Sequence, residues 1–372
     1  MHLEALCRTL DAAGAKPLHV QRLLRHWCQA LPLAAGKRRL EDFLPLAVRQ
    51  VLPEWQAGLE QLARLQSAHP DVDGAERLLV RLADGQTVES VLLPRQGLCV
   101  STQVGCAVGC VFCMTGRSGL LRQVGSAEIV AQVALARQRR EVRKVVFMGM
   151  GEPAHNLDNV MAAIELLGTL GNIGHKNLVF STVGDPRVFE RLPQGPVKPA
   201  LALSLHTTRA ALREQLLPRA PRLSPEDLVA QGDAYARATG YPVQYQWTLL
   251  AGVNDGQDEI DGIVRLLAGR YGVLNLIPYN DVDDLPYARP SWAQAAEMAR
   301  QLHRRGVLTK LRHSAGQEVA GGCGQLRARA LGPQPGQATA RGAPAGAASS
   351  PPASGPAALQ LPWPQRMSPP AV

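Results

Sequence analysis

Three cysteines close together in the chain have the type and spacing to bind iron. Cys106, Cys110 and Cys113 follow a C-x3-C-x2-C pattern, and no fourth cysteine follows nearby. A structural zinc site or an electron-transfer iron–sulfur cluster usually takes four protein ligands. A group of three therefore predicts a [4Fe–4S] cluster in which one iron is left open to bind a small molecule.

Two other interpretations of these cysteines remain open at this point. The thiols could be buried structural side chains, although free cysteine is scarce and reactive. They could also hold zinc together with a distant His or Cys. An open iron is typical of radical S-adenosylmethionine (SAM) chemistry, which makes an enzyme the leading hypothesis.

The composition of the chain narrows its class. The 372 residues, 46% of them hydrophobic, suffice for one large domain with a smaller addition. Seven unevenly spaced cysteines argue against a secreted disulfide framework. Since no signal-peptide pattern and no membrane-spanning apolar run is found, we expect a cytoplasmic protein without a membrane partner. The net charge of +9 favours a polyanionic partner without identifying one.

The elements that must position the cysteines begin with two smaller segments. Residues 1–70 carry short amphipathic helical patterns with Arg-rich stretches, and we expect a helical accessory domain that binds RNA. Residues 71–97 hold two strand patterns around Asp84-Gly85, which is a hairpin-turn signal. At the other end, residues 331–372 are rich in Ala, Pro and Gly and contain no acid, so we expect disorder there.

Residues 98–330 alternate β and α patterns, which predicts an α/β fold with parallel strands and crossover helices. The repeats suit a partial (β/α)6-type barrel of the radical SAM kind, and a doubly wound sheet is the alternative. The expected strands are Leu98–Thr102, Lys144–Met150, Asn177–Thr182, Ala200–His206, Val243–Leu250, Val273–Tyr279 and Val307–His313. The expected helices are Ala127–Arg140, Asp158–Leu170, Pro225–Arg237, Asp258–Arg270 and Ser291–Arg304.

Polar residues and glycines gather where these strands end. Because the carboxyl ends of parallel strands meet at one edge, the residues should surround one site. Ser204 and Asn280 could instead cap helices, and His206 could be a half-buried structural side chain. Together, however, the set offers partners for a ribose and an amino-acid head group, the groups that SAM presents. It comprises Gly151, Glu152, Ser181, Ser204, His206 and Asn280.

In order along the chain, the motifs resemble those of the RlmN/Cfr family of radical SAM RNA methyltransferases. The resemblance covers roughly residues 15–330. It rests on Thr87–Leu93, Cys99–Cys113, Met148–Pro153, Ser181–Gly184, Leu203–His206, Gly252–Asp255, Asn275–Asn280 and Cys323–Leu326. Ala315-Gly316-Gln317-Glu318 differs from the Arg-Gly-Asp-Asp common in the family, and Met114–Ser118 also differs. These departures leave the RNA and the modified position open.

The resemblance implies two cofactors and one set of catalytic residues. A [4Fe–4S] cluster would bind Cys106, Cys110 and Cys113. SAM would contact Gly151, Glu152, Ser181, Ser204, Leu205, His206 and Asn280. Cys323 would carry the methyl group, Cys99 would be its resolving partner, and Glu89 would accept a proton.

The implied reaction methylates a ring carbon of adenosine in rRNA or tRNA, with C2 favoured over C8. Such a carbon is not nucleophilic, so the resemblance implies that Cys323 first takes a methyl group from one SAM. A 5′-deoxyadenosyl radical from a second SAM then removes a hydrogen atom from this methyl group, and the carbon radical adds to the ring. Loss of a ring proton and attack by Cys99 would release the methylated RNA and leave a transient disulfide.

The expected partners are RNA and a reductant such as flavodoxin or ferredoxin, with the protein itself a monomer. Two alternatives stay open. One is a radical SAM enzyme with a different RNA modification, such as methylthiolation, although such enzymes generally carry further cluster cysteines. The other is a non-enzymatic metal-containing RNA-binding protein.

Overall fold

The computed structural model describes residues 1–33, 40–117, 119–280, 285–312 and 324–331. The chain divides into two units, Met1–Gly332 and Pro333–Val372. The second unit lies outside the described residues, so the predicted disorder of the tail stays a prediction. Cys323 and Ala315–Glu318 are also outside them.

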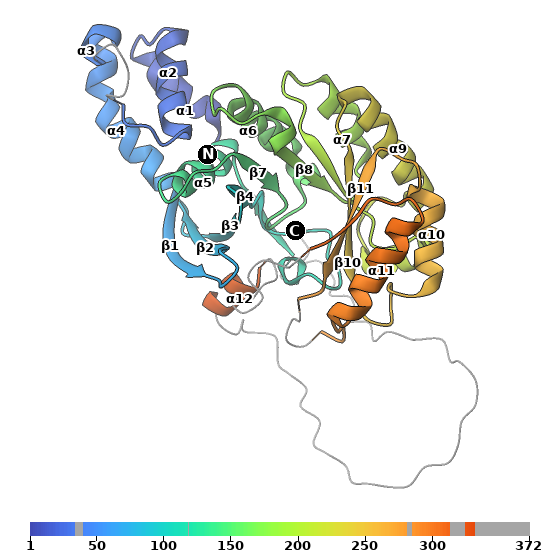
Figure 1. Cartoon of the computed structure of the whole chain (residues 1–372). Coiled ribbons are helices and arrows are strands. Elements are labelled where there is room, and N and C mark those ends of the chain that lie inside the picture. Colours follow the sequence, from blue (N-terminus) through green and yellow to red (C-terminus); the bar gives the residue numbers. More distant parts are fainter. Residues whose placement is uncertain (34–39, 118, 281–284, 313–323, 332–372) are drawn as a thin grey trace, which may run out of the picture. The chain divides into compact units, whose positions relative to one another are not determined.

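The chain begins with helices that lie together (Figure 1), and buried leucines of the first, second and fourth of them belong to one apolar core. They are α1 (Leu3–Ala12), α2 (Pro17–Cys28), α3 (Leu40–Phe43) and α4 (Leu46–Leu62). The Trp55 indole on α4 is buried and donates to the Leu6 carbonyl at 3.2 Å, which ties α4 to α1. The predicted helical segment is too long, because Ala63–Pro70 forms strand β1. Its weak apolar alternation, directly after α4, gave no signal for a strand.

In the part of the chain that the structure describes, ten strands form a mixed sheet. Its antiparallel part runs from β1 through β2 (Glu76–Leu82) and β3 (Thr87–Leu93) to β4 (Gly97–Val100). The predicted turn between β2 and β3 is confirmed, since Gly85 has φ +83° and the Leu82 N–H donates to the Gln86 carbonyl at 2.8 Å.

From β4 onward the strands are parallel and follow one another in chain order. A doubly wound sheet would reverse its strand order at a switch point. The unreversed order therefore excludes that alternative and confirms the α/β fold of the partial-barrel type. The strands are β7 (Lys144–Phe147), β8 (Leu178–Thr182), β9 (Ala200–Ser204), β10 (Val243–Leu249), β11 (Gly272–Pro278) and β12 (Thr309–Leu311).

Helices lie along the outside of the curved sheet (Figure 1). The five predicted helices are α5 (Ser126–Arg137), α6 (Leu157–Thr169), α9 (Pro225–Thr239), α10 (Gln257–Leu267) and α11 (Trp292–Arg304). Three short helices have no sequence counterpart among the predictions: α7 (Pro186–Arg191), α8 (Ala210–Leu216) and α12 (Gln325–Leu331). Two small strands, β5 (Gln103–Gly105) and β6 (Leu120–Gln123), pair with each other on either side of the cysteine loop.

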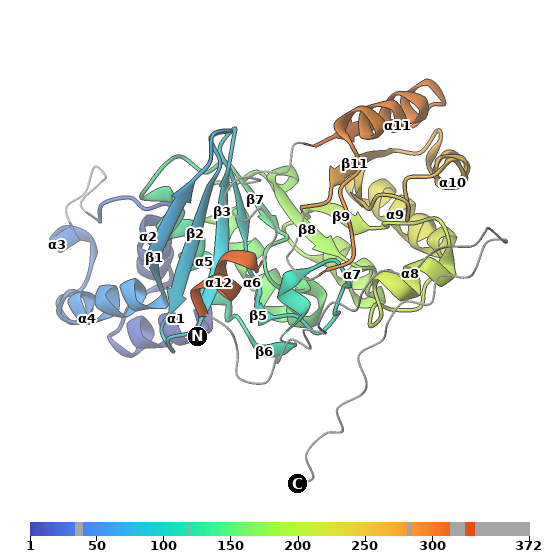
Figure 2. The same ribbon diagram turned by 90° about the horizontal axis from the view of Figure 1, so that it is seen from below.

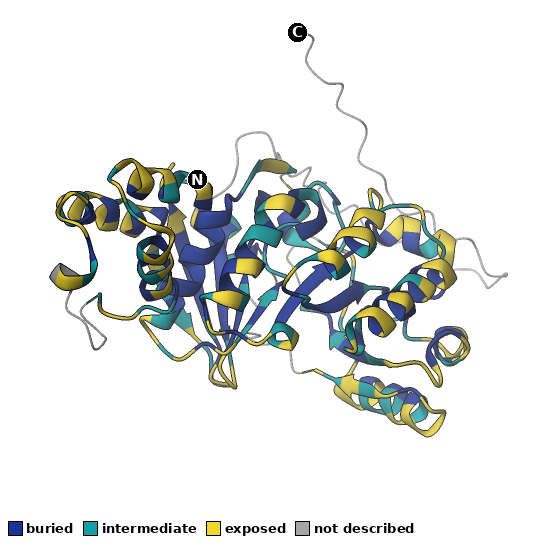
Figure 3. Cartoon of the chain, turned by 90° about the horizontal axis from the view of Figure 1, so that it is seen from above, coloured by how far each residue is buried: buried dark blue, intermediate teal, exposed yellow. Residues whose placement is uncertain are grey.

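The two faces of the sheet differ in character. Phe147, Phe180 and Trp247 are fully buried against the outer helices and belong to the main apolar core. The opposite face, called the inner face below, carries a small separate apolar cluster around Val179 and Ala202. Figure 3 shows the strands dark blue and the solvent sides of the helices yellow. Polar side chains on the inner face are therefore available for a ligand.

Candidate active site

Strand register places predicted site residues from four strands on the inner face. Cys99 on β4 lies opposite Val91 on β3, and Glu89 shares the face of Val91 because side chains alternate along a strand. On the other side, Cys99 pairs with Val146 of β7, which pairs with Val179 of β8. By the same alternation, Ser181 on β8 and Ser204 on β9 point to this face.

The cysteine loop packs over the carboxyl ends of the parallel strands. Cys106 is buried with Val183, Leu250 and Tyr279, which follow β8, β10 and β11. Arg219 fixes the loop from outside by donating to the Ala107 carbonyl at 3.0 Å. The loop thus lies where parallel β/α folds carry their chemistry.

The donor chemistry of the loop fits an iron–sulfur cluster. All three thiols are free. Burial raises the pKa of Cys106 to about 12, whereas backbone N–H groups of Val108 and Gly109 act to lower it. Thr115 and Gly116 do the same for Cys113, whose pKa is raised by burial. N–H groups aimed at sulfur stabilise thiolates, which is the form that binds iron.

The arrangement of the thiols also bears on the zinc alternative. Within the described residues, no three His, Cys, Asp or Glu side chains are grouped as for a single metal ion. Cys106 and Cys113 nevertheless both act electrostatically on Cys110, which raises its pKa further after burial. In a [4Fe–4S] cluster each thiolate binds a different iron, so the three sulfurs need proximity without meeting at one point. The triplet fits the cluster better than a lone ion.

Glu152 is held beneath this loop by backbone donors. It is 5% exposed, and its two carboxylate oxygens accept from the N–H groups of Ala154 and Val183, each at 3.1 Å. Burial raises its pKa to about 7, against the hydrogen bond from Thr182. A carboxylate preformed in this way can accept from an ammonium group.

Gly151 lets the chain pass close to Gln103. Its φ is +106°, and a Cβ here would lie 2.6 Å from the Gln103 Cβ. Only glycine fits such an approach. The Gln103 side chain in turn accepts from the Glu152 N–H at 2.7 Å, so this close contact sets the position of Glu152.

Three further predicted SAM contacts lie at the ends of β8 and β9. Ser181 is buried and Ser204 is half-buried. Leu205 is fully buried, and its N–H donates to the Gln246 carbonyl.

The next residue, His206, is 6% exposed and has φ +62°, a strained value for a residue with a side chain. Its ring lies edge-on to Phe112 of the cysteine loop, with the ring centroids 5.0 Å apart. Burial lowers the pKa of His206 to about 3, so the ring is neutral and its Nδ1 accepts from the Thr248 N–H.

Two residues absent from the predicted site hold the backbone of His206 and its successors. Asn254 is fully buried and donates to the His206 carbonyl at 2.7 Å. Glu259 on α10 has no exposed surface and accepts from the N–H and hydroxyl of Thr208 at 2.7 and 2.6 Å, and also from Thr207. Asn254 lies in the Gly252–Asp255 motif, but nothing near Glu259 in the sequence indicated its role.

Arg213 on α8 was also missed. It is 3% exposed and donates to the carbonyls of Val183 and Ser204 at 2.6 and 3.2 Å, bridging the ends of β8 and β9. Its Nε is buried without a hydrogen-bond partner among the described residues. Burial lowers its pKa to about 10, while Cys110 and Glu152 act to raise it. A buried cation therefore lies near both Cys110 and Glu152.

Asn280, after β11, lies at the far side of this edge. It is half-buried, and its Oδ1 is 3.4 Å from a donor nitrogen of Arg289. Arg289 also donates to the Tyr279 carbonyl at 2.6 Å. Asn280 thus lies at the same edge as the other predicted SAM contacts.

Glu89 contacts the segment that follows Cys323 in the sequence. It is 2% exposed, its Oε1 accepts from the Arg327 N–H at 2.8 Å, and N–H groups of Gly324 and Leu326 also donate to the carboxylate. Arg77 forms an ion pair with it at 3.4 Å. Burial raises the pKa of Glu89, and these donors oppose the rise. Figure 2 shows α12 beside β3.

Gly324 joins this segment to the cysteine loop. A Cβ on Gly324 would lie 2.8 Å from the Thr115 hydroxyl oxygen. Cys323 itself lies outside the described residues. Cys99, the predicted resolving residue, has a pKa raised to about 12 by burial, with Glu89 adding to the rise and Arg77 opposing it.

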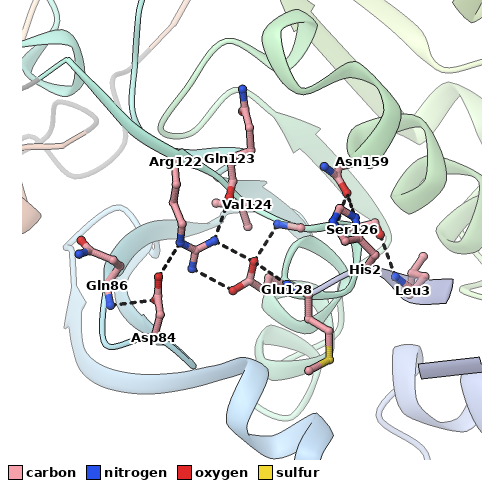
Figure 4. Close-up of polar contacts among 12 residues, drawn as sticks. His2, Leu3, Asp84, Gln86, Arg122, Gln123, Val124, Ser126, Glu128 and Asn159 are labelled. Atoms are coloured by element: carbon pink, nitrogen blue, oxygen red, sulfur yellow. Dashed lines mark hydrogen bonds and ion pairs between the residues drawn. The ribbon is translucent and has the colours of Figure 1, made fainter. Parts of the chain in front are cut away.

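The small β5–β6 sheet that frames the cysteine loop is anchored by Arg122 (Figure 4). Its guanidinium pairs with Asp84 of the β2–β3 turn at 2.6 Å and with both oxygens of Glu128 on α5 at 3.0 Å. Glu128 also accepts from the Gly125 N–H at 2.7 Å. The ion pair with Asp84 ties the small sheet to the β2–β3 turn, and the bidentate pair with Glu128 ties it to α5.

Comparison with known proteins places this geometry in a family. A sequence model of the radical SAM superfamily matches residues 100–267. A probable RNA methyltransferase of Leptothrix cholodnii is 74% identical over 333 residues, which cover 90% of this chain and 96% of that protein. One from Methylibium petroleiphilum is 75% identical over 332 residues, covering 89% and 94%. One from Pseudomonas aeruginosa is 69% identical over 332 residues, covering 89% and 96%.

A solved structure agrees with these relatives. The crystal structure of a radical SAM methyltransferase from Sphaerobacter thermophilus superposes with a TM-score of 0.75 at 32% identity. The match covers 87% of this chain and 97% of that one. In the part of the chain that the structure describes, no helix is long and apolar enough to span a membrane.

Proposed function

We propose that this chain, which belongs to the radical SAM RNA methyltransferases, methylates a ring carbon of adenosine in rRNA or tRNA, at C2 in preference to C8. In this proposal the methyl group travels on Cys323, Glu89 accepts the ring proton, and Cys99 resolves the covalent link between Cys323 and RNA. When bound, the [4Fe–4S] cluster and SAM supply reductive radical formation and the methyl group. The proposed cluster ligands are Cys106, Cys110 and Cys113.

The observation that carries the proposal is the hydrogen bonding of Glu89. Its carboxylate accepts from the backbone of Gly324 and Arg327, on a face that it shares with Cys99. A general base must lie within reach of the proton that it removes. This arrangement supports a role for Glu89 beside the chain that follows Cys323.

The proposed SAM contacts follow from the edge described above. Glu152 would accept from the SAM ammonium group, with Gly151 letting the backbone approach. Ser181, Ser204, Leu205, His206 and Asn280 would contact the rest of the molecule. Arg213, Asn254 and Glu259 would hold these residues in place through the backbone. A flavodoxin or ferredoxin would reduce the cluster, and we expect the protein to act as a monomer.

The experiment compares Cys323→Ala with wild type after anaerobic reconstitution of the cluster. The variant should form 5′-deoxyadenosine slowly at most and transfer no methyl group to RNA, because the carrier sulfur is gone. Cys7→Ala is the control, since Cys7 is a free cysteine on α1, far along the chain from the site. It should methylate RNA at the wild-type rate.

Normal methylation by Cys323→Ala would contradict the cysteine-linked mechanism. If the wild type forms no 5′-deoxyadenosine from SAM, the enzymatic proposal fails and a non-enzymatic metal-containing protein remains. Mass spectrometry of nucleosides from rRNA and tRNA of a deletion strain identifies the RNA and separates 2-methyladenosine from 8-methyladenosine. A missing methylthio nucleoside would instead support the other modification outcome.

A further inference from the structure

Four basic residues from three distant segments converge, and none of them forms an ion pair with an acidic residue that the structure describes. Arg95 lies in the turn between β3 and β4, Lys144 is the first residue of β7, and Lys310 lies in β12 with Arg312 just after it. Arg95, Lys310 and Arg312 are exposed, and Lys144 is half-buried. We call these four residues the cation cluster.

The strand register directs much of this cluster to the inner face. Lys144 alternates with Val145 and so shares the inner face with Val146. Lys310 pairs with Asn275 of β11, which shares the inner face because Leu274 and Leu276 pack in the outer core. The Arg312 Nε donates to the Asn275 side chain at 2.8 Å, which keeps its guanidinium near the same face.

Backbone contacts bring the remaining member to β7. The Gln96 carbonyl, next to Arg95, accepts from the Lys144 N–H at 3.2 Å. The members also affect one another's pKa values across the sheet. Burial lowers the pKa of Lys144, and so do Arg312 and Lys310. Burial also lowers the pKa of Arg312, and Arg95 lowers it further.

Two arginines close to this cluster in the sequence form ion pairs with acidic residues. Arg139 pairs with Glu76 and Arg143 pairs with Glu141, each at 2.5 Å. Within the described residues, no ion pair is formed by Arg95, Lys144, Lys310 or Arg312. Like charges held together cost stability. The hydrogen bond from Arg312 to Asn275 does not neutralise these charges, so an anion from outside the described residues would stabilise the cluster.

We propose that the cation cluster binds phosphodiester groups of the RNA that carries the target adenosine. The inference rests on the proposed function and deepens it by naming an RNA-backbone contact surface. Lysine supplies a mobile point charge and arginine a fork that fits phosphate oxygens. Such contacts position RNA without reading its sequence.

An acidic reductant protein is the other polyanion to consider. Electron transfer requires the reductant to approach the iron–sulfur cluster, and the cysteine loop follows β5 at the carboxyl edge of the parallel strands. Arg95 and Lys144 lie at the opposite, amino ends of β4 and β7. An RNA chain extends on both sides of its modified nucleotide, so its phosphates can contact these cations while the adenosine lies at the carboxyl edge. A reductant has to dock close to the cluster itself, and the position of these two cations therefore favours RNA.

The test measures binding of a fluorescent 30-nucleotide single-stranded RNA to the reconstituted full chain across a range of salt concentrations. The double variant Lys310→Gln/Arg312→Gln should bind roughly tenfold more weakly, and the slope of log K against log salt should fall by about 1.4, or about 0.7 per lost contact. Arg237→Gln/Arg265→Gln removes two exposed cations from the outer helices α9 and α10 and is the matched control. It should leave affinity and slope unchanged.

The charge-conserving variant Lys310→Arg/Arg312→Lys separates charge from folding, and it should keep the wild-type slope. An unchanged slope in the Gln double variant, or an equal loss in the outer-helix control, overturns the proposal. RNA binding that stays intact while reduction by flavodoxin slows would also overturn it in favour of an acidic protein. If wild-type protein transfers no methyl group to RNA, the proposed function itself fails.

Discussion

Two regions of the inner face treat charge in opposite ways. At the carboxyl edge, the buried carboxylates of Glu89 and Glu152 are each held by backbone N–H donors. At the amino ends of β4 and β7, Arg95 and Lys144 belong to a cluster of cations with no acidic partner among the described residues. The carboxylates already have hydrogen-bond donors before a ligand binds. The cations would gain an opposite charge only when a ligand binds.

The difference separates two kinds of recognition. Prearranged donors around a carboxylate lower the cost of binding a small cationic group, because little reorganises when the ligand arrives. An uncompensated cation cluster attracts a large polyanion at long range and in a salt-dependent way. The first suits the amino-acid end of SAM, and the second suits RNA.

The largest effect should come from the charge of Glu152. With a pKa of about 7, the carboxylate loses its charge as pH falls below 7, and SAM binding should weaken toward about tenfold per pH unit. Glu152→Gln should bind SAM about 10- to 100-fold more weakly and without this pH dependence. Equilibrium dialysis of SAM against the reconstituted protein between pH 5.5 and 8 measures both.

A flat wild-type profile would show that Glu152 does not bind a cationic group. The same titration affects stability in the opposite sense. Because the folded chain holds this proton more tightly than the unfolded chain, whose ordinary carboxyl pKa is 4.5, Glu152 costs stability as pH rises from that value through about 7. The negative charge of Glu152 thus favours SAM binding and lowers the stability of the fold.

A smaller effect should follow from Gly151→Ala. The new Cβ would lie 2.6 Å from the Gln103 Cβ at φ +106°, so the variant should lose roughly 2–4 kcal/mol of unfolding free energy. Gly252→Ala is the control, since Gly252 has φ +69° but open space around its Cβ position, and it should lose about 1–2 kcal/mol. Urea unfolding compares the two, and equal losses would remove the argument for close packing at Gly151.

Local patterns predicted most of this molecule. The parallel strands, the five longer helices and the hairpin at Asp84-Gly85 each have a strong pattern in a short window. Strand β1 was not predicted, because its alternation of apolar and polar residues is weak and no turn separates it from α4. The short helices α7 and α8 offer too few residues for a helical period.

The site shows a different limit. Motifs at strand ends led to the prediction of Glu152 and His206 as SAM contacts, because each lies among residues of its own motif. Glu259 acts on Thr207 and Thr208 from about fifty residues away, and only the packing of α10 brings it there. Lys144 and Arg312 are still further apart in the sequence and meet only through the register and curvature of the sheet. Such contacts leave no trace in a local window.

The smallest expected effect is that of Lys144→Gln on the free energy of unfolding. This variant should change stability and RNA affinity in opposite directions. Lys144→Gln removes a half-buried charge whose pKa is lowered by burial and by neighbouring cations. Below that pKa the lysine is charged in both states, and the folded state bears the repulsion, so the variant should gain about 0.2–1 kcal/mol of unfolding free energy. The gain should shrink at high salt because salt screens the repulsion.

Lys176→Gln, at an exposed lysine outside the cluster, should produce no such gain in the same urea unfolding series. The Lys144 variant should at the same time bind RNA more weakly than wild type. A residue that lowers stability and raises affinity is retained for binding. If Lys144→Gln is destabilising, or if it leaves RNA affinity unchanged, the contrast between the two regions of the inner face does not hold.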